Sequence, residues 1–325
     1  MKVLITGANG FVGSHIVEKL LENKEEVSAI VRKTSNLKWI KDLPITLKYG
    51  SLDDAVFLES CAAEVDAIVH CAGTVRAMDK EGYFKSNVEN TANLCRAALN
   101  ANPKLKRFIY ISSQAAMGPS ASEIGKKLDE DLKPASDYGE SKLAAEKALK
   151  NQLKNKIPYT ILRPASVYGP RDKDIFIFFN LVNKHLKPIT AKKRLIQLVF
   201  VKDIAKAVIS AINNEKSANK TFYLAQKKPY SWKEVAETIN KTAKKSLLPV
   251  ILPDFIFKIA GFFAQSASIL TKKPAVLNNQ KIIEMLCSFW IADTEPAEND
   301  LGIVFTSLEL GSEITYNWYL KNKYF

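Results

Sequence analysis

A glycine-rich segment near the start of the chain is the strongest constraint on its fold. Lys2–Thr6 has the apolar, β-branched character of a strand, and Phe11–Leu21 repeats apolar residues at helical spacing. The junction between them reads Thr6-Gly7-Ala8-Asn9-Gly10-Phe11-Val12-Gly13. Glycines at these positions allow a tight turn, close approach of a ligand to the backbone, and close packing of helix on strand. The segment therefore predicts a phosphate-binding turn at a helix N-terminus, with a purely structural turn as the alternative.

The first half of the sequence repeats this alternation of strand and helix. Further strands are expected at Val27–Val31, Ala67–His70, Phe108–Ser112 and Tyr159–Leu162, and a strong helix at Ser141–Leu153. Such alternation predicts an α/β fold, a doubly wound parallel sheet of the Rossmann type with helices on both faces. The turn would then bind a dinucleotide.

The chain is about twice the usual length of one domain, and its pattern changes after Pro164. Loops lengthen there, with an isolated helix at Asp203–Ile212 and a short strand at Thr221–Leu224. We therefore expect a dinucleotide-binding domain over residues 1–165 and a smaller mixed α/β substrate lobe over 166–325. Residues 197–212 are expected to return to the first domain.

Charge and composition exclude several classes of protein. The net charge of +13 comes mainly from lysines scattered along the chain, which indicates a solvated basic surface rather than a nucleic-acid site. The four cysteines and three histidines show no ligand spacing, so no metal site is expected. Reduced thiols and a short N-terminal apolar run favour a cytoplasmic protein.

One apolar segment, 255–270, approaches the length of a membrane-spanning helix. It is 16 residues long and contains Lys258, whereas a membrane-spanning helix needs about 20 apolar residues. A helix packed in the second lobe is favoured over a peripheral membrane anchor.

The end of the second expected strand bears on the choice of dinucleotide. An acidic residue there would bind the ribose 2′-hydroxyl, whereas this chain carries Arg32, Lys33 and Ser35. These groups favour a 2′-phosphate, so NADP is expected rather than NAD. The alternative, in which Arg32 stacks beneath the adenine, suits either cofactor.

A second motif supplies acid–base chemistry. In Tyr138-Gly139-Glu140-Ser141-Lys142, the tyrosine and lysine are four residues apart at the start of a helix and share one face. An ammonium beside a phenol is expected to lower the phenol's pKa and make it a usable general acid or base.

These motifs together resemble the extended short-chain dehydrogenase/reductase family, in its epimerase/dehydratase-like group. The resemblance covers about the first 205 residues and includes TGANGFVG, His70-Cys71-Ala72-Gly73, Asn87, Tyr110-Ile111-Ser112-Ser113, YGESK, Arg163-Pro164-Ala165-Ser166-Val167-Tyr168-Gly169-Pro170 and Val199-Phe200-Val201-Lys202-Asp203. It implies an enzyme that uses NAD(P).

The resemblance also implies the catalytic roles. Ser113 would hydrogen bond to the reacting oxygen, Tyr138 would transfer the proton, and Lys142 would hold the nicotinamide ribose. Ala72 and Gly73 would pass beside the cofactor.

Further roles follow for the cofactor's surroundings. Asn87 would lie near the site, unless it caps a helix. Pro164, Ser166 and Val167 would border the nicotinamide. The pair Ser51-Leu52 matches a segment that usually carries an acid where Ser51 stands, which would weaken its contact with the adenine. His70 is expected to be a hydrogen-bonded polar group rather than an acid or base.

Departures from the family pattern reduce the number of reactions that the resemblance allows. Gln114 and Ala115 stand where the family's dehydratases carry Asp-Glu, and neither can transfer a proton usefully. Ser166 and Ile196 stand where its sugar-nucleotide epimerases usually carry Asn and Arg. No arginine follows Arg194, which disfavours a substrate diphosphate because guanidinium groups bind such groups bidentately. Of the second lobe's residues, only Arg171 and Arg194 could serve, although lysines could substitute.

The second lobe is instead rich in large apolar side chains. Most are expected in the core, but together they suit a pocket for an apolar alcohol or ketone. They are Phe176, Phe178, Phe179, Phe255, Phe257, Phe262, Phe263, Phe289 and Trp290. This resembles the branch containing 3β-hydroxysteroid dehydrogenases and dihydroflavonol reductases.

Three functions follow as hypotheses. The favoured one is an NAD(P)-dependent oxidoreductase acting on a secondary alcohol or ketone; the alternatives are a nucleotide-sugar epimerase with tightly bound NAD(P) and a non-catalytic dinucleotide-binding protein. The family resemblance also implies a homodimer whose interface is built from helices at Ser86–Leu99 and Ser141–Leu153.

Overall fold

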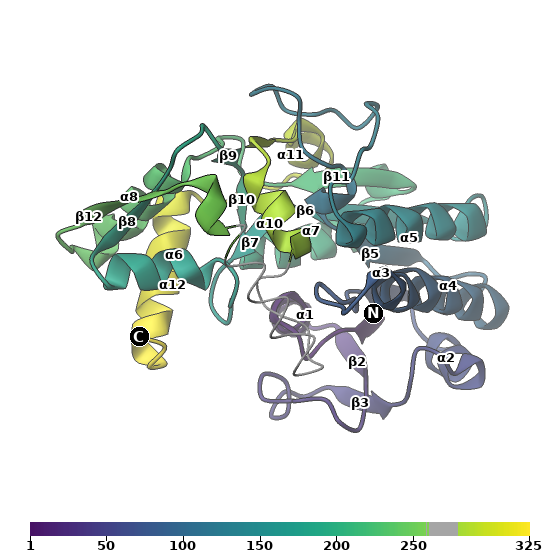
Figure 1. The fold of residues 1–325 in the computed structure, drawn as a ribbon. Helices are drawn as coiled ribbons and strands as arrows, with labels where there is room; N and C mark the ends of the chain where they lie inside the picture. The colour runs from purple at the N-terminus through teal and green to yellow at the C-terminus, as the bar shows by residue number, and fades with distance from the viewer. Residues whose placement is uncertain (258, 260–278) are drawn as a thin grey trace.

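A parallel sheet of seven strands organises the N-terminal part of the molecule (Figure 1). The computed structural model describes residues 1–257, 259 and 279–325. The sheet order is β11-β6-β5-β4-β1-β2-β3, and every neighbouring pair runs parallel. The strands are β1 (Lys2–Thr6), β2 (Glu26–Val31), β3 (Thr46–Tyr49), β4 (Ala67–His70), β5 (Arg107–Ile111), β6 (Tyr159–Pro164) and β11 (Lys220–Leu224).

Helices cover both faces of the sheet because alternate strand residues point to opposite sides. In β1, Val3 and Ile5 belong to the core beneath α1 (Phe11–Glu22) and α7 (Val201–Asn213). Leu4, between them, belongs to the core beneath the helices of the other face. These are α2 (Ala55–Ala62), α4 (Asn90–Ala101) and α5 (Asp137–Leu153). The predicted doubly wound Rossmann-type sheet is confirmed.

Element boundaries follow the sequence pattern closely, with informative differences. α5 begins at Asp137, before the expected Ser141, because the Ser136 hydroxyl accepts a hydrogen bond from the Gly139 amide at 3.1 Å and caps the helix. The short strand β3 was not expected, since its residues are half-buried or exposed and carry little periodicity. The strand expected at Thr221–Leu224 forms the sheet edge beside β6.

A turn of unusual geometry replaces the start of the helix expected at Ser86. Helix α3 (Lys80–Phe84) runs into a π-helical turn, Lys85–Glu89, which continues as α4. Such turns place an extra residue in the helix and often occur at functional sites.

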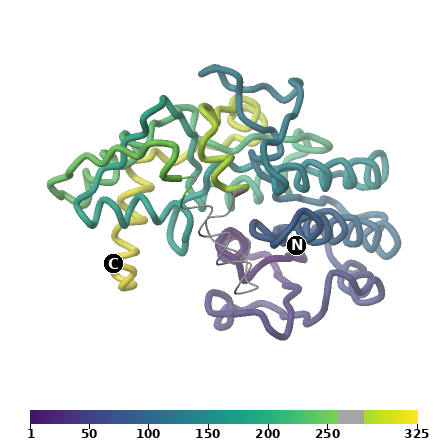
Figure 2. Tube along the Cα trace, viewed as in Figure 1, coloured from purple at the N-terminus to yellow at the C-terminus, as the bar shows by residue number. Residues whose placement is uncertain are grey.

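The C-terminal part packs helices against short strand pairs, and Figure 2 shows its green and yellow chain beside the sheet. β8 (Leu186–Thr190) pairs with β12 (Leu248–Leu252), β7 (Ser166–Tyr168) with β10 (Leu198–Phe200), and β9 (Leu195–Ile196) with β13 (Phe289–Trp290). Its helices are α6 (Phe176–Asn183), α8 (Trp232–Ala243), α10 (Asn279–Leu286), α11 (Glu295–Leu301) and α12 (Leu308–Lys321).

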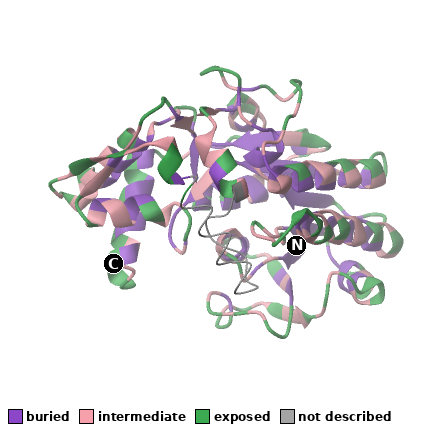
Figure 3. Cartoon of the chain, in the orientation of Figure 1, coloured by how far each residue is buried: buried purple, intermediate pink, exposed green. Residues whose placement is uncertain are grey.

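The segment 197–212 divides between the two regions. Its strand β10 pairs with β7, outside the seven-stranded sheet, whereas helix α7 lies against α1 on the sheet. Burial follows this packing, with the central strands coloured as buried in Figure 3.

Most of the apolar segment 255–270 lies outside the described residues, including Lys258, Phe262 and Phe263. Within the described part of the chain, no helix combines the length and the apolarity needed to cross a bilayer.

Candidate active site

The glycine-rich turn joins β1 to α1 in a conformation that requires two of its glycines. Gly7 has φ +73°, a region that favours glycine, and a Cβ there would lie 2.6 Å from the Ala72 nitrogen. A Cβ on Gly13 would lie 2.1 Å from the Gly7 oxygen, so only glycine allows this contact between helix and turn. At Gly10 a Cβ would meet only the Gly7 oxygen, at 3.2 Å.

The first amides of α1 are available to an anion. Gly10 is the N-cap residue and offers no side chain, and within the described residues no hydrogen bond is made by the amides of Phe11, Val12 and Gly13. Asn9 ties the turn to the loop after β2 through a 3.4 Å hydrogen bond from its side chain to the Asn36 carbonyl. Unpaired amides at a helix N-terminus fit the pyrophosphate of a dinucleotide.

The basic residues after β2 lie at the edge where an adenosine ribose would bind. Arg32 and Lys33 are exposed, and neither pairs with an acidic group in the described chain. Ser35 is half-buried, and its hydroxyl accepts a hydrogen bond from the Arg32 amide at 3.1 Å. The arrangement leaves two cations free to meet an anionic ligand.

Ser51 and Leu52 follow β3 in a short turn. The Ser51 hydroxyl donates to Asp53 at 3.2 Å, and the Leu52 carbonyl accepts from Asn93 at 3.1 Å. Asp53 thus supplies a carboxylate beside Ser51, where this chain lacks the acid that the family usually carries.

The loop after β4 is held by an ordered chain of hydrogen bonds through His70. The Ala72 amide donates to the Thr6 hydroxyl at 3.2 Å, and that hydroxyl lies 2.7 Å from His70 Nδ1. Because the Thr91 hydroxyl donates to the Asn87 carbonyl at 2.6 Å, it accepts from His70 Nε2 at 3.0 Å, which leaves Nδ1 to accept from Thr6. Burial lowers the pKa of His70 to about 3, which keeps it neutral. His70 is a hydrogen-bonded polar group, as the sequence predicted.

Asn87 fixes the same loop from the π-helical turn. Its carboxamide oxygen accepts from the Thr74 amide at 2.8 Å, and its amide group donates to the Thr74 carbonyl at 3.1 Å and to Ser141 at 2.9 Å. A Cβ on Gly73 would lie 2.9 Å from the Asn87 oxygen. Asn87 therefore does not cap a helix but ties the loop after β4 to α5.

Ser113 and Tyr138 meet at the carboxyl end of the sheet. Ser113 follows β5, and its hydroxyl hydrogen bonds with the Tyr138 phenol. Tyr138 lies in the first turn of α5, where Ser136 caps the helix, and its ring centre is 6.2 Å from that of Tyr83. The expected pair is thus assembled from two separate elements.

Lys142 lies one helical turn further along α5 and is 4% exposed. Its ammonium donates to the Ile111 carbonyl at 2.8 Å and lies 4.3 Å from the centre of the Tyr110 ring. Burial lowers the pKa of Lys142 to about 8, although Cys71 and Glu146 act in the opposite direction. The lysine is therefore fixed at the end of β5, facing Gly73 across the site.

The electrostatics of Tyr138 differ from the expectation. Burial raises the pKa of Tyr138 above its ordinary value; the hydrogen bond from Ser113 acts against this, while Glu284 adds to it. The predicted lowering by Lys142 is wrong for these residues, because the ammonium is directed to the Ile111 carbonyl. The phenol consequently keeps its proton at neutral pH and is set up as a proton donor.

Pro164, Ser166 and Val167 continue the carboxyl edge of the sheet after β6. Pro164 is buried, whereas Ser166 and Val167 are half-buried in β7. They come directly after Arg163, whose guanidinium is held in the core by a hydrogen bond to Glu146, so the start of this segment is fixed in place.

Helix α10 contributes a set of contacts that the sequence did not reveal. Glu284 accepts a 2.5 Å hydrogen bond from Ser136, and Gln280 exchanges two hydrogen bonds with Asp137, at 2.9 and 2.8 Å. The helix thus covers the first turn of α5, beside Tyr138. No motif marks these residues, and their long separation from α5 in the sequence gave no signal.

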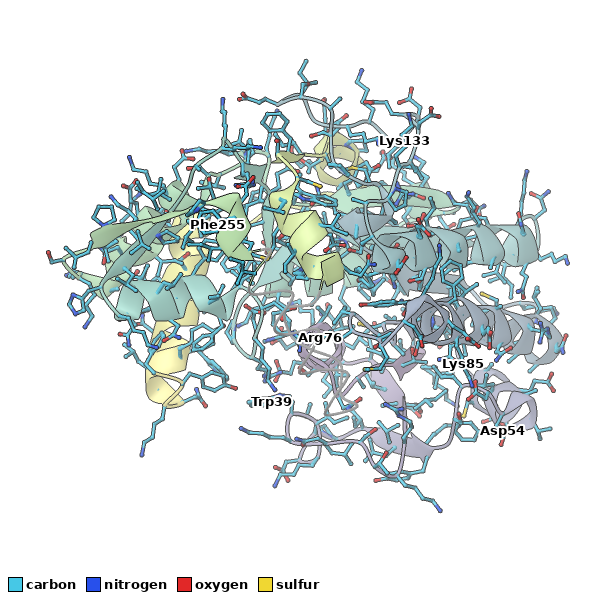
Figure 4. The ribbon with its side chains drawn as sticks, viewed as in Figure 1. Trp39, Asp54, Arg76, Lys85, Lys133 and Phe255 are labelled. Atoms are coloured by element: carbon cyan, nitrogen blue, oxygen red, sulfur yellow. The ribbon has the colours of Figure 1, made fainter. Side chains whose placement is uncertain are left out.

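The arginines that face the C-terminal part are all paired with carboxylates. Arg76, labelled in Figure 4, pairs with Asp174 and joins the loop after β4 to the loop after β7. Arg171 pairs with Glu18 and also donates to Ser14 at 2.9 Å.

Arg194 is similarly committed. It is 2% exposed, pairs with Asp254 at 2.8 Å and donates to the Leu286 carbonyl at 3.4 Å. Both second-lobe arginines that the sequence offered as diphosphate ligands therefore hold structural contacts instead.

Four of the second-lobe aromatic residues named from the sequence belong to one core. Phe178, Phe179 and Phe257 are buried together with Trp232, and Phe176 packs on Tyr319 with ring centres 4.8 Å apart. For Phe176, Phe178, Phe179 and Phe257 the interpretation as core is confirmed, whereas Phe262 and Phe263 lie outside the described residues. Phe255 is 59% exposed.

Phe289 and Trp290 are half-buried in β13. The Trp290 ring nitrogen donates to the Glu284 carbonyl at 2.9 Å, so this pair supports α10 next to Tyr138. No group of three or more His, Cys, Asp or Glu side chains within residues 1–257, 259 and 279–325 is arranged to hold a metal ion.

Fold and site together define a Rossmann-type protein with a dinucleotide-binding turn and a serine–tyrosine–lysine set. Residues 3–225 match the model of the NAD dependent epimerase/dehydratase family. The chain belongs to this family, and a nicotinamide dinucleotide is thereby supported as the cofactor class.

Relatives of two kinds match much of the chain. It is 26% identical over 318 residues to a ceramide reductase of Caulobacter vibrioides (strain NA1000 / CB15N), with 98% of this chain and 94% of that protein covered. It is 30% identical over 274 residues to a UDP-glucose 4-epimerase of Vibrio cholerae, with 80% and 81% covered. Family membership makes the chain an enzyme of this type and leaves both reactions open.

A solved structure supports the fold. The crystal structure of the Bordetella bronchiseptica enzyme WbmH in complex with NAD+ matches with a TM-score of 0.77 at 24% identity, covering 98% of each chain.

Proposed function

We propose that this protein is an NAD(P)-dependent oxidoreductase that interconverts a secondary alcohol and a ketone. The proposal rests on the hydrogen-bonded Ser113–Tyr138 pair with Lys142 one helical turn away. A bound nicotinamide dinucleotide would supply or accept the hydride. In reduction, Tyr138 donates its phenolic proton to the oxygen of the former carbonyl, and Ser113 holds that oxygen by a hydrogen bond.

The surrounding residues support these two steps. The raised pKa of Tyr138 keeps the phenol protonated before transfer, which suits the reductive direction. The three unpaired amides of α1 bind the pyrophosphate, and Lys142 holds the ribose near Gly73. Pro164, Ser166 and Val167 border the nicotinamide, and Ala72 and Gly73 pass beside the cofactor.

One observation favours the oxidoreductase over the epimerase. The guanidinium groups of Arg76, Arg171 and Arg194 are each paired with a carboxylate, so none of them is free to bind a substrate diphosphate. An uncharged, largely apolar alcohol or ketone needs no such group. The match to a ceramide reductase over nearly the whole chain agrees with a substrate of this class.

The epimerase remains the second candidate because the Vibrio relative shares 30% identity over 274 residues. The two reactions differ in their net redox change. We expect a steady change in nicotinamide absorbance when the protein is mixed with cofactor and apolar ketones or alcohols, and none with UDP-sugars. Turnover of a UDP-sugar to its epimer, without net absorbance change, would establish the epimerase instead.

We further propose that the cofactor is NADP. Arg32 and Lys33 are exposed and unpaired in the described chain, and Ser35 adds a hydroxyl beside them. Replacing Arg32 with Ala should weaken NADP binding about tenfold, ~1.4 kcal/mol, and leave NAD binding nearly unchanged. Lys41→Ala, which removes one exposed charge from the following loop, is the control. Calorimetry that shows equal losses for both cofactors would contradict the assignment.

The proposed assembly is a homodimer. Helices α4 and α5 lie side by side on one face of the sheet, and each carries exposed polar residues, including Arg96 and Lys147. Two copies could join these helices into a four-helix interface. Light scattering should give twice the mass of one chain, and a monomer at micromolar concentration would contradict this.

A further inference from the structure

A buried ion pair lies directly behind the proposed catalytic groups. Glu146 is 1% exposed and follows Lys142 by one helical turn and Tyr138 by two, so the three share one face of α5. Arg163, 2% exposed, binds it with both arms of its guanidinium: Nε donates to Oε1 at 2.9 Å and Nη2 to Oε2 at 2.6 Å.

Two further hydrogen bonds extend this pair to other strands. The Ser112 hydroxyl donates to Glu146 Oε1 at 2.5 Å, and Arg163 Nη1 donates to the Tyr223 hydroxyl at 2.9 Å. Ser112 immediately precedes Ser113, and Arg163 immediately precedes Pro164. The network therefore joins the carboxyl ends of β5, β6 and β11 to the middle of α5.

Stability alone does not account for a charged pair at this position. Removing two charges from water is costly, and apolar side chains of similar volume often replace a buried ion pair without loss of stability. What an apolar pair cannot reproduce is the direction of four hydrogen bonds, which fixes both the rotation and the height of α5 against the strand ends.

We propose that the Glu146–Arg163 pair, with Ser112 and Tyr223, is a positioning network that holds Tyr138 and Lys142 in register with Ser113 and the nicotinamide edge. The inference rests on the proposed oxidoreductase function. Small displacements matter in such a site, because a shift of about 1 Å between reacting groups can lower the rate about a hundredfold. Glu146 also favours the charged form of Lys142, since its carboxylate raises the pKa of that lysine against the effect of burial.

The principal test replaces the charged pair by an apolar one, Glu146→Leu with Arg163→Met. The double variant should remain folded, with its Tm within a few degrees of the original, and should bind cofactor with little change in Kd. Its kcat should fall about 10- to 100-fold. A folded double variant that keeps full kcat would overturn the proposal.

Arg107 provides a matched control. It is another fully buried arginine, located at the opposite end of β5 and paired with Glu215 at 3.4 Å. Arg107→Met should leave kcat unchanged whatever its effect on Tm, which shows that loss of a buried arginine does not by itself slow the reaction. An equal loss of kcat in this control would assign the effect to stability and overturn the proposal.

Milder variants serve if the double variant does not fold. Ser112→Ala and Tyr223→Phe each remove one hydrogen bond, and each should lower kcat several-fold with little change in Kd for the cofactor; wild-type kcat in both would overturn the proposal. Glu146→Gln should also move the basic limb of the pH profile to lower pH, because Lys142 loses a stabilising charge.

Tyr138→Phe tests the proposed oxidoreductase function separately from the positioning network. If that variant is inactive while the folded double variant is fully active, the oxidoreductase assignment stands and the positioning network is rejected. If Tyr138→Phe retains full activity, the proposed function itself fails.

Discussion

The two halves of the molecule use their buried charges differently. In the sheet-bearing half, Lys142, Glu146 and Arg163 converge on the carboxyl ends of β5 and β6. In the C-terminal half, the buried Arg194 is bound to Asp254 and to a main-chain carbonyl, and Arg171 fastens the start of that half to α1. One set of charges surrounds the proposed reaction, whereas the other joins structural elements.

This difference supports the proposal that the sheet-bearing half carries the chemistry and the C-terminal half the selectivity. Proton transfer requires groups of controlled charge, and these come from α5 and the strand ends. In the C-terminal half, α10 forms hydrogen bonds with the start of α5 near Tyr138, and β13 supports α10 through the Trp290 ring nitrogen. The proposed preference for an uncharged substrate rests on the pairing of Arg76, Arg171 and Arg194 with carboxylates.

The largest expected effect tests the reactive group itself. Replacing Tyr138 with Phe should lower kcat about 10³-fold, since the proton donor is lost, and cofactor affinity should hardly change. Tyr83→Phe is the control, because its ring neighbours that of Tyr138 while its hydroxyl donates to the Val75 carbonyl. Single-turnover measurements of nicotinamide absorbance report the effect. If the Tyr138 variant kept an unaltered rate, the assignment of the chemistry to the sheet-bearing half would be wrong.

The next effect separates two roles within the glycine turn. Gly13→Ala should lower the free energy of unfolding by about 1–3 kcal/mol and weaken cofactor binding strongly, because its Cβ would lie 2.1 Å from the Gly7 oxygen. Gly10→Ala should cost less stability than Gly13→Ala, since its Cβ would meet only the Gly7 oxygen, at 3.2 Å, yet it should weaken cofactor binding. Thermal denaturation and calorimetry distinguish them. Intact cofactor binding in both variants would place the pyrophosphate elsewhere.

A smaller effect concerns pH. Because the pKa of Lys142 is lowered to about 8, its ammonium is lost as pH rises through that value, and kcat/KM should fall about tenfold per pH unit above it. The free energy of unfolding should change in the opposite direction. Between pH 8 and 10.5 the Lys142 amine is protonated in the unfolded chain but not in the folded one, so folding becomes more favourable as pH rises through this range. Lys142→Arg should remove the basic limb. A basic limb that coincides with unfolding would contradict this assignment.

The smallest expected effect on turnover comes from the C-terminal half. Arg194→Met should lower the free energy of unfolding by about 2 kcal/mol, because Asp254 loses its charged hydrogen bond. Turnover of an uncharged ketone should stay within about twofold once the protein is folded. Loss of activity restricted to UDP-sugars would instead give Arg194 a role in substrate binding.

Much of the fold followed from local pattern. The strands β1 and β4 begin and end at the predicted residues, and the glycine turn lies where the spacing required it. The short strand β3 and the π-helical turn have no comparable pattern of apolar residues in the sequence. Pairing with β2 forms the strand, and the hydrogen bonds of Asn87 hold the turn, so both depend on residues distant in the sequence.

The candidate site was only partly predictable for the same reason. Ser113, Tyr138 and Lys142 stand in recognisable motifs. Glu284 and Gln280 lie more than 140 residues from their partners on α5 and belong to no motif. The second lobe's aromatic residues gave an ambiguous signal, since a large apolar side chain looks the same in a core as in a pocket until its neighbours are known.

The sequence by itself determined the parallel sheet, the dinucleotide turn and the residue types of the reactive set, because each depends on periodicity or on spacing within a few residues. Only the tertiary structure decided how the charges act. It directs the Lys142 ammonium to a main-chain carbonyl, raises the pKa of Tyr138 by taking its phenol out of water, and pairs Arg76, Arg171 and Arg194 with carboxylates. Burial and partner distance set the energy of a charge, and both arise from residues that are far apart along the chain.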